Sequence, residues 1–223
     1  MGALEPVTPH GRRVLVVASG PSAEGMDLCL AAEARRAGVY VLAVNGAGLW
    51  VPAADGWFTL DPDERALRVL ALRPGTYDNF VAVPDDYGAS DARVRYHRDR
   101  VLPAFVHRLR RVSGDGPLSC RYGLSEDRAA VHTGNSAYGA LGVAYHMRPD
   151  RVGLIGVDAR AALGYAYAKG RPRTRLDHVP RLFASAAPQL AARGIDVMNG
   201  SPGSAVACFR AAPPDDVLRW LMG

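Results

Sequence analysis

The sequence is poor in several features that define common protein classes. Its 223 residues hold three cysteines, an odd and widely spaced set that fits neither a disulfide framework nor a zinc site and predicts buried free thiols: Cys29, Cys120 and Cys208. No long apolar run is present, which excludes an ordinary transmembrane helix. The first residues lack the basic and apolar stretches of a secretory signal. We therefore expect a cytoplasmic protein that has no membrane partner.

Two nucleotide-binding motifs are also missing. Ala18 stands where the first glycine of G-x-G-x-x-G would be, and no lysine follows the turn as in G-x-x-x-x-G-K-[ST]. The chain therefore does not match ordinary NAD enzymes or P-loop ATPases.

What is present is an apolar strand at residues 14–18, a small polar turn and a helix expected over residues 23–37. Gly20 permits close approach of a ligand, Pro21 suits a first helical turn, and Ser22 is predicted to cap the helix. Helix N-termini favour anions, so Ser19 and its neighbours predict a phosphate site. A plain turn that binds nothing is the alternative.

The rest of the chain alternates strands and helices. Apolar runs predict strands at residues 14–18, 39–44, 56–60, 79–83, 151–155 and 195–198. Helical patterns lie at residues 23–37, 62–72, 136–146, 180–193 and 214–221. This predicts a single α/β domain with a Rossmann-like, mostly parallel sheet and helices on both faces.

Two segments interrupt the alternation. Residues 84–122 form an expected irregular basic insertion, and residues 159–179 a lid-like excursion rich in Gly, Tyr and Arg. Loops at the carboxyl edge of such a sheet usually carry substrate contacts, so we expect an acceptor site or lid there.

Charge gives a weaker indication. The chain has 27 basic and 22 acidic residues, a net charge of +5, and arginine runs at residues 93–100, 107–111 and 169–175. Such runs can contact a nucleic-acid backbone, and DNA is one candidate partner. They can equally be solvated surfaces of an arginine-rich chain.

Three expected strands end in a polar side chain, namely Asn45, Asp61 or Asp158. An asparagine there can recognise a ribose or a base, although it can also form a turn. Asp61 can hold a divalent cation or begin a helix, so the metal question stays open. A core sheet has no need of polar groups at so many carboxyl ends, and their convergence predicts a binding site.

Further polar groups follow later strands. A second helix N-terminus, suited to phosphate or sugar, is offered by Thr133, Gly134, Asn135 and Ser136. Two phenols that can contact a phosphate are Tyr165 and Tyr167, and His178 is the expected general base. Asn199 and Ser201 end the last strand, where they either bind a nucleotide or turn the chain.

In this order, the motifs ASGPS (18–22), AVN (43–45), TGNSAY (133–138), LIGVD (154–158) and NGSPGS (199–204) resemble one superfamily. It contains the sialyltransferases of glycosyltransferase family 42, 6-hydroxymethylpterin diphosphokinase-like proteins and many bacteriophage proteins, of which the phage branch is most similar. The resemblance covers most of residues 13–207, without residues 84–122.

The resemblance implies a nucleotide-dependent transferase, most simply a glycosyltransferase that moves a sugar from a CMP-, UDP- or GDP-linked donor to a hydroxyl group. It implies that the nucleotide is lined by Gly20, Pro21, Ser22, Asn45, Thr133, Gly134, Asn135, Asn199 and Ser201, with Tyr165 and Tyr167 at the donor phosphate and His178 as base. A phage origin would place it in the host cytoplasm, with modified DNA as a candidate acceptor. An ATP- and magnesium-dependent pyrophosphokinase that uses Asp61 and Asp158, and a non-catalytic nucleotide- or DNA-binding protein, are the alternatives.

Overall fold

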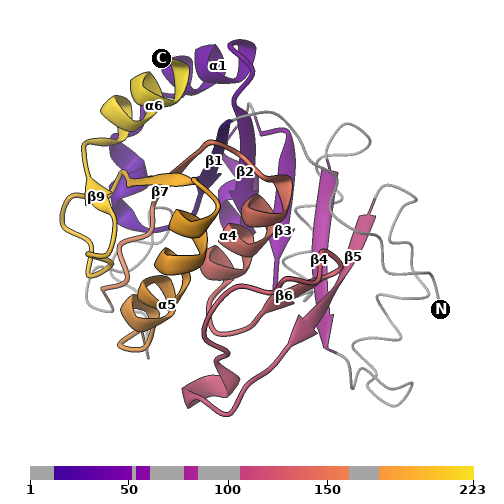
Figure 1. The fold of residues 1–223 in the computed structure, drawn as a ribbon. Helices are drawn as coiled ribbons and strands as arrows, with labels where there is room; N and C mark the ends of the chain where they lie inside the picture. Colours follow the sequence, from indigo (N-terminus) through magenta and orange to yellow (C-terminus); the bar gives the residue numbers. More distant parts are fainter. Residues whose placement is uncertain (1–12, 52–53, 61–77, 85–105, 161–175) are drawn as a thin grey trace.

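The computed structural model describes residues 13–51, 54–60, 78–84, 106–160 and 176–223. Within these ranges the chain forms one parallel sheet whose strand order is β6-β5-β4-β3-β2-β1-β7-β8-β9 (Figure 1). Its strands are β1 (Arg13–Val17), β2 (Tyr40–Val44), β3 (Gly56–Thr59), β4 (Asp78–Pro84), β5 (Val106–Val112), β6 (Ala130–His132), β7 (Arg151–Ile155), β8 (Asp196–Asn199) and β9 (Arg210–Ala211).

The strand order reverses beside β1. The chain runs outward from β1 through β2 to β6 and then returns to place β7 on the other side of β1. In open α/β sheets the crevice at such a reversal, outside the carboxyl ends of the strands, is where ligands bind.

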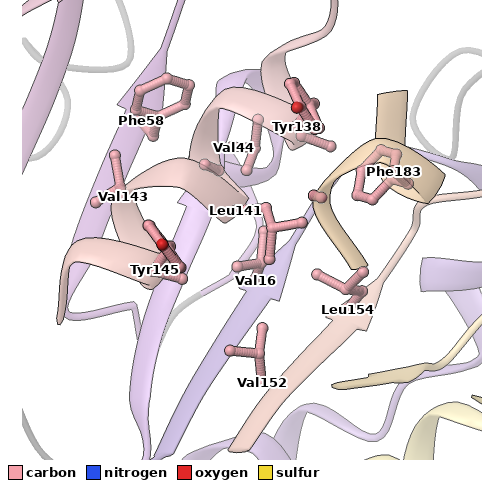
Figure 2. Close-up of a cluster of buried hydrophobic side chains, with 14 of the residues drawn as sticks. Val16, Val44, Phe58, Tyr138, Leu141, Val143, Tyr145, Val152, Leu154 and Phe183 are labelled. Atoms are coloured by element: carbon pink, nitrogen blue, oxygen red, sulfur yellow. The ribbon is translucent and has the colours of Figure 1, made fainter. Parts of the chain in front are cut away.

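Helices cover both faces of the sheet. They are α1 (Leu28–Arg36), α4 (Ser136–Met147), α5 (Val179–Ala192) and α6 (Pro214–Met222), and short 3₁₀ turns lie at η1 (Pro21–Gly25), η2 (Asn45–Leu49) and η3 (Pro117–Ser119). Side chains of α4 and α5 pack over Val16, Val44 and Leu154 (Figure 2). Leu15, Val17 and Ile155 point to the opposite face, where α1 and α6 cover them. Alternate residues of each strand thus meet different helices, which explains the unbroken apolar runs.

The structure confirms the predicted fold class and the position of all six predicted strands, each within one or two residues of its expected bounds. Three strands were not predicted, namely β5, β6 and β9. Strand β5 lies within residues 84–122, a segment that was expected to be irregular. Helices α4, α5 and α6 match their predictions, whereas the predicted helix at residues 62–72 falls outside the described residues.

The single helix predicted over residues 23–37 is wrong. The chain makes the 3₁₀ turn η1 and then begins α1 at Leu28, because Asp27 accepts hydrogen bonds from the amides of Cys29 (2.8 Å) and Leu30 (3.3 Å). Asp27 is therefore the N-cap of the helix. Ser22 makes no capping bond, since its hydroxyl is used elsewhere.

The cysteines are free, as predicted, but only Cys120 is buried, whereas Cys29 and Cys208 are exposed. None of the helices in the described ranges is long and apolar enough to cross a membrane.

Two arginines at the amino edge of the sheet bind the C-terminal end of α6. Arg13 donates to the carbonyls of Leu221 (2.9 Å) and Met222 (2.8 Å), and Arg151 donates to that of Trp220 (2.6 Å). These cations satisfy the last carbonyls of α6 and oppose the negative end of its dipole. A cavity of about 480 Å³ lies beside Arg13, Asp150 and Arg151, at the sheet edge opposite the strand carboxyl ends.

A buried histidine makes the stability of the protein dependent on pH. His146 of α4 is 1% exposed; its Nε2 contacts the Ala130 carbonyl at 3.0 Å, and its Nδ1 has no partner. Burial lowers the pKa of His146; the hydrogen bond to the Ala130 carbonyl and the charge of Asp127 oppose this effect, and the nearby charges of Arg193 and Arg128 add to it. The folded protein therefore resists a proton that the unfolded chain accepts.

We expect the free energy of unfolding to be highest above pH 6.5 and to decrease as the pH falls through 6.5 toward the lower folded-state pKa, by about 1.4 kcal/mol for each unit that separates the two pKa values. In His146→Gln this decrease should be smaller. Urea unfolding at a series of pH values measures it, with the two proteins compared first at pH 7.5. Parallel curves for both proteins between pH 7.5 and 5 would contradict the assignment.

Candidate functional site

The candidate site lies where the carboxyl ends of β1 and β7 meet. Beyond the strands the two backbones stay paired, since the Ala18 amide donates to the Ile155 carbonyl and the Gly20 amide to the Gly156 carbonyl, both at 2.8 Å. This contact fixes the turn after β1 against the turn after β7, at the point where the strand order reverses.

Two glycines make the contact possible. A Cβ on Gly20 would lie 2.1 Å from Asp158 Oδ2 and 2.3 Å from the Gly156 carbonyl oxygen. Gly156 has a φ of +75°, and a Cβ there would lie 2.3 Å from the Ala18 carbonyl oxygen. Only glycine fits at either position. The close approach that Gly20 permits here is to Gly156 and Asp158 of the protein itself, and its approach to a ligand stays a prediction.

A chain of hydrogen bonds joins three predicted site residues. Ser22 Oγ lies 2.9 Å from Asp158 Oδ2 and 2.6 Å from Ser201 Oγ, and the Ser22 amide contacts the same carboxylate oxygen at 3.3 Å. Because a carboxylate only accepts, Ser22 donates to Asp158 and Ser201 donates to Ser22. Asp158 is 5% exposed and Ser201 is fully buried. The amide and hydroxyl of Ser22, which were expected to donate to a phosphate, thus donate to the Asp158 carboxylate.

Three buried polar atoms at the carboxyl ends of β1, β2 and β8 lack a hydrogen-bond partner in the described part of the molecule: Ser19 Oγ, Asn45 Oδ1 and Asn199 Oδ1. Asn199 is fully buried at the end of β8, and its Nδ2 donates to the Val206 carbonyl at 3.3 Å, which assigns the unpaired atom as the amide oxygen. An unpaired buried acceptor costs about 1–3 kcal/mol. Such an atom needs a partner, which an ordered water, an ion or a bound ligand can supply.

Asn45 follows β2 with a φ of +50°, a left-handed conformation that asparagine tolerates better than most residues. Its carbonyl accepts a hydrogen bond from Trp57 Nε1 at 2.8 Å, which fixes the turn into η2. Asn45 therefore turns the chain, which is one of the two roles considered for it, and its Oδ1 is left unpaired, so its recognition of a ribose or a base stays a prediction.

The predicted second helix N-terminus forms at the start of α4. Asn135 accepts from the amides of Ala137 (2.9 Å) and Tyr138 (3.3 Å), so it caps the helix. Thr133 is fully buried and donates its hydroxyl to the Ser119 carbonyl. Ser136 begins the helix beside them. Two of the first amides of α4 are thus satisfied within the protein, and what remains for a ligand is chiefly the helix dipole.

His178 packs against this second helix start. Its Nε2 lies 2.9 Å from the Gly134 carbonyl oxygen. A carbonyl only accepts, so Nε2 carries a proton, and in the tautomer that this contact selects the lone pair lies on Nδ1. No other hydrogen bond of His178 exists among the described residues. The geometry gives one ring orientation with a basic nitrogen available.

Gly134 is held tightly, with a φ of +133° and the position of a Cβ lying 2.6 Å from Leu182 Cδ1 and 2.8 Å from Cys120 Sγ. The carbonyl that orients His178 is therefore fixed by buried packing.

The predicted residues thus form two groups. The first is the Asp158 group, which contains Ser19, Gly20, Pro21, Ser22, Asn45, Asp158, Asn199 and Ser201; the second is the His178 group, which contains Thr133, Gly134, Asn135, Ser136 and His178. No hydrogen bond joins Asp158 to His178 in the described structure. The predicted residues Asp61, Tyr165 and Tyr167 lie outside the described residues. Within the described ranges, no group of three or more His, Cys, Asp or Glu side chains is arranged to hold a metal ion.

Sequence reasoning missed two contributors to the site. The first is Gly156, whose carbonyl accepts the hydrogen bond from the Gly20 amide. The only indication of it in the sequence is that a glycine directly follows an apolar strand. Ser204 donates to the Val157 carbonyl at 2.6 Å and fixes the loop after β8 against the loop after β7. Its position in a run of small polar residues gave no indication of this contact.

No model of a protein family matches this sequence, and neither does any curated protein. Solved structures do match. A structure of the sialyltransferase CstII from Campylobacter jejuni, in complex with the substrate analogue CMP-3FNeuAc, aligns with a TM-score of 0.50 and 12% identity over 92% of this chain and 87% of that chain. A Cst-II variant in complex with CMP aligns with a TM-score of 0.50 and 14% identity, over 91% and 87% of the two chains.

A third match is the MAf glycosyltransferase from Magnetospirillum magneticum AMB-1, with a TM-score of 0.53 and 13% identity. It covers 97% of this chain but 38% of that one, so the chain spans well under half of that larger protein. The chain has the fold of these glycosyltransferases. At such identities the likeness concerns the fold alone.

The close approach of the two glycines gives a direct test of the site's architecture. Gly20→Ala should destabilise the protein by about 1–3 kcal/mol, because the added methyl overlaps Asp158 and the Gly156 carbonyl. Gly25→Ala is the matched control, since that glycine lies in the same turn and a Cβ there meets nothing within 4 Å. Chemical denaturation measures both. Equal stability of the two variants would show that the β1–β7 contact is loose.

Proposed function

We propose that this protein is a nucleotide-dependent glycosyltransferase that moves a sugar from a nucleotide-sugar donor to a hydroxyl acceptor. The observation that carries the proposal is the set of unpaired buried atoms at the reversal of the strand order, namely Ser19 Oγ, Asn45 Oδ1 and Asn199 Oδ1. The two amide oxygens need hydrogen-bond donors, which the hydroxyls of a ribose and the amino group of a base supply.

The comparisons support the same ligand class. The CstII structures hold CMP and the CMP-linked analogue CMP-3FNeuAc, and they share the fold of this chain. We propose that the nucleotide occupies the Asp158 group here, where the carboxylate positions Ser22 and Ser201. Those hydroxyls then face the nucleoside, and the start of α4 near Thr133 lies toward the phosphate.

His178 is the proposed general base. Its Nδ1 removes the proton of the acceptor hydroxyl, whose oxygen attacks the anomeric carbon while the bond from that carbon to the donor phosphate breaks. The nucleotide leaves with the electron pair of that bond. The negative charge that grows on it is stabilised by the dipole of α4 and, as the family resemblance implies, by Tyr165 and Tyr167. The Gly134 carbonyl keeps the His178 ring in the tautomer that this step requires.

The hydroxyl group that accepts the sugar is proposed on different grounds from the donor. The arginine-rich composition and the likeness to phage proteins make hydroxymethylated DNA the acceptor that we would assay first.

Thermal stability in the presence of nucleotides tests the donor class. We expect one of CMP, UDP or GDP to raise the midpoint of unfolding by several degrees without added metal, because a ligand that binds only the folded state stabilises it. Stabilisation by ATP with Mg²⁺ alone would instead indicate the pyrophosphokinase. The absence of any nucleotide effect would contradict the proposed function and favour a DNA-binding or structural role.

Removal of the base should separate binding from turnover. His178→Gln can still donate to the Gly134 carbonyl but cannot accept a proton, so we expect an unchanged nucleotide-induced shift and a loss of donor hydrolysis or transfer of about 100-fold or more. His178→Ala should lose turnover to the same extent. Undiminished turnover in both variants, measured by release of the free nucleotide, would remove His178 from the mechanism.

A further inference from the structure

One arginine at the carboxyl edge of the sheet, Arg111, belongs to neither the Asp158 group nor the His178 group. Arg111 is the second-last residue of β5 and pairs in register with Pro84 of β4 and Val131 of β6. Leu109, two residues earlier on the same strand face, is fully buried beneath α4. Alternation along a strand therefore directs Arg111 to the α4 face, at the edge where the candidate site lies.

The guanidinium of Arg111 is only partly satisfied. Its Nη1 donates to the Leu60 carbonyl at 3.2 Å, while its Nε is enclosed and has no hydrogen-bond partner. The side chain is half-buried, and no carboxylate pairs with it within the described structure. A cation in that setting carries a desolvation cost that an anionic partner would remove.

Other arginines do find acidic partners. The next residue back, Arg110, pairs with Asp127 at 2.7 Å, and acidic partners within the described ranges are also found for Arg35, Arg193, Arg210 and Arg219. Among exposed arginines a missing partner has no significance, because water solvates the charge. Within the described residues, the Nε atoms of Arg111 and Arg128 are closed off from water. Arg128 precedes β6 and so lies at the amino edge of the sheet, away from the candidate site.

A second source of positive potential lies close to Arg111. Leu60, whose carbonyl binds the guanidinium, also packs against α4, since a Cβ on Gly139 would lie 3.3 Å from Leu60 Cδ2. The N-terminal half of α4 and Arg111 thus border the same residue. The Thr133 amide, just before α4, bonds to the carbonyl of Val112, the neighbour of Arg111. The dipole of α4 and the Arg111 guanidinium therefore both contribute positive potential to one region, next to the His178 group.

We propose that Arg111 binds an oxyanion of the substrate, a phosphate or a carboxylate, at the carboxyl ends of β3–β5 beside the start of α4. Its terminal nitrogens can form the charge-assisted contacts that guanidinium makes with such groups, while its Nε stays enclosed by the protein. The inference deepens the proposed glycosyl transfer and rests on it for the identity of the substrate. It also extends the site along the sheet edge, from β8 and β1 as far as β5.

Binding of simple anions tests the assignment without a nucleotide. Inorganic pyrophosphate and glucuronate serve as the phosphate and carboxylate probes, in chloride buffer, with the midpoint of thermal unfolding and isothermal titration as readouts. We expect at least one probe to stabilise the wild type by several degrees, and Arg111→Gln to bind it at least about tenfold more weakly. Arg111→Lys, which keeps the charge but loses the planar fork, should be intermediate. The probe that responds identifies the kind of oxyanion.

Arg36→Gln is the matched control, because Arg36 is an exposed arginine on α1, a helix that covers the other face of the sheet. It should bind the probes like the wild type. Circular dichroism establishes that each variant is folded, and Arg111→Lys carries the test if Arg111→Gln is not. No response of the wild type to either probe, or an equal response in all the proteins, would overturn the inference.

The two proposals fail in different ways. Cytidine, uridine and guanosine carry no oxyanion, so their binding depends on the Asp158 group and not on Arg111. A response to pyrophosphate or glucuronate that needs Arg111, without any response to nucleosides or nucleotides, would reject the glycosyltransferase proposal alone. Nucleotide binding that does not change in Arg111→Gln, together with an absent anion response, would reject the role of Arg111 alone.

Discussion

The backbone contact between the turns after β1 and β7 is the constraint on which the candidate site depends. The amides of Ala18 and Gly20 continue the pairing of the two strands beyond their ends. Gly20 and Gly156 allow the turns to touch, and the next residues of each turn then bring Ser22 and Asp158 within hydrogen-bond distance. Because the strand order reverses beside β1, this contact lies at the place where open α/β sheets generally bind ligands.

The same contact determines which amides of the turn after β1 are available to a ligand. A glycine turn that leads into a helix is expected to offer its amides to a phosphate. Here the Gly20 amide is used by β7 and the Ser22 amide by Asp158, and the turn continues as a short 3₁₀ helix that ends before α1. An anion on Ser22 would lie against a buried carboxylate. The arrangement therefore favours a neutral, hydroxyl-rich part of the ligand at this point, with its charge placed elsewhere.

The sequence predicts the fold well where burial alone determines structure. Strands β1, β2 and β7 are covered on both faces, so their apolar runs are unambiguous. Strand β5 was not predicted because its many charged residues do not form an apolar run, although the strand buries Leu109. Strand β6 was not predicted because it has only three residues. The break before α1 was missed because Asp27 competes locally with the helical pattern that continues around it.

For the site, the sequence predicts which strand ends carry polar groups but not their partners. Ser22 looks like a cap, and only tertiary packing turns its hydroxyl toward Asp158. The proton position on His178 depends on a carbonyl 44 residues away in the chain. Arg111 looks like one member of a basic run, and its proposed role rests on the lack of an acidic partner among the described residues, which no sequence pattern displays.

The polarity of the unsatisfied atoms along the sheet edge restricts the ligand further than the fold does. Near β1, β2 and β8 the unpaired atoms include two amide oxygens, which require hydrogen-bond donors. Near β3 to β5 the unsatisfied group is the Arg111 guanidinium, which requires an acceptor with negative charge. One molecule meets both demands only if hydroxyl or amino groups lie at one end and an oxyanion at the other. The proposed nucleotide-sugar donor has this polarity, and Asn45 and Arg111, which follow or end strands three spacings apart, are the pair that one such molecule could join.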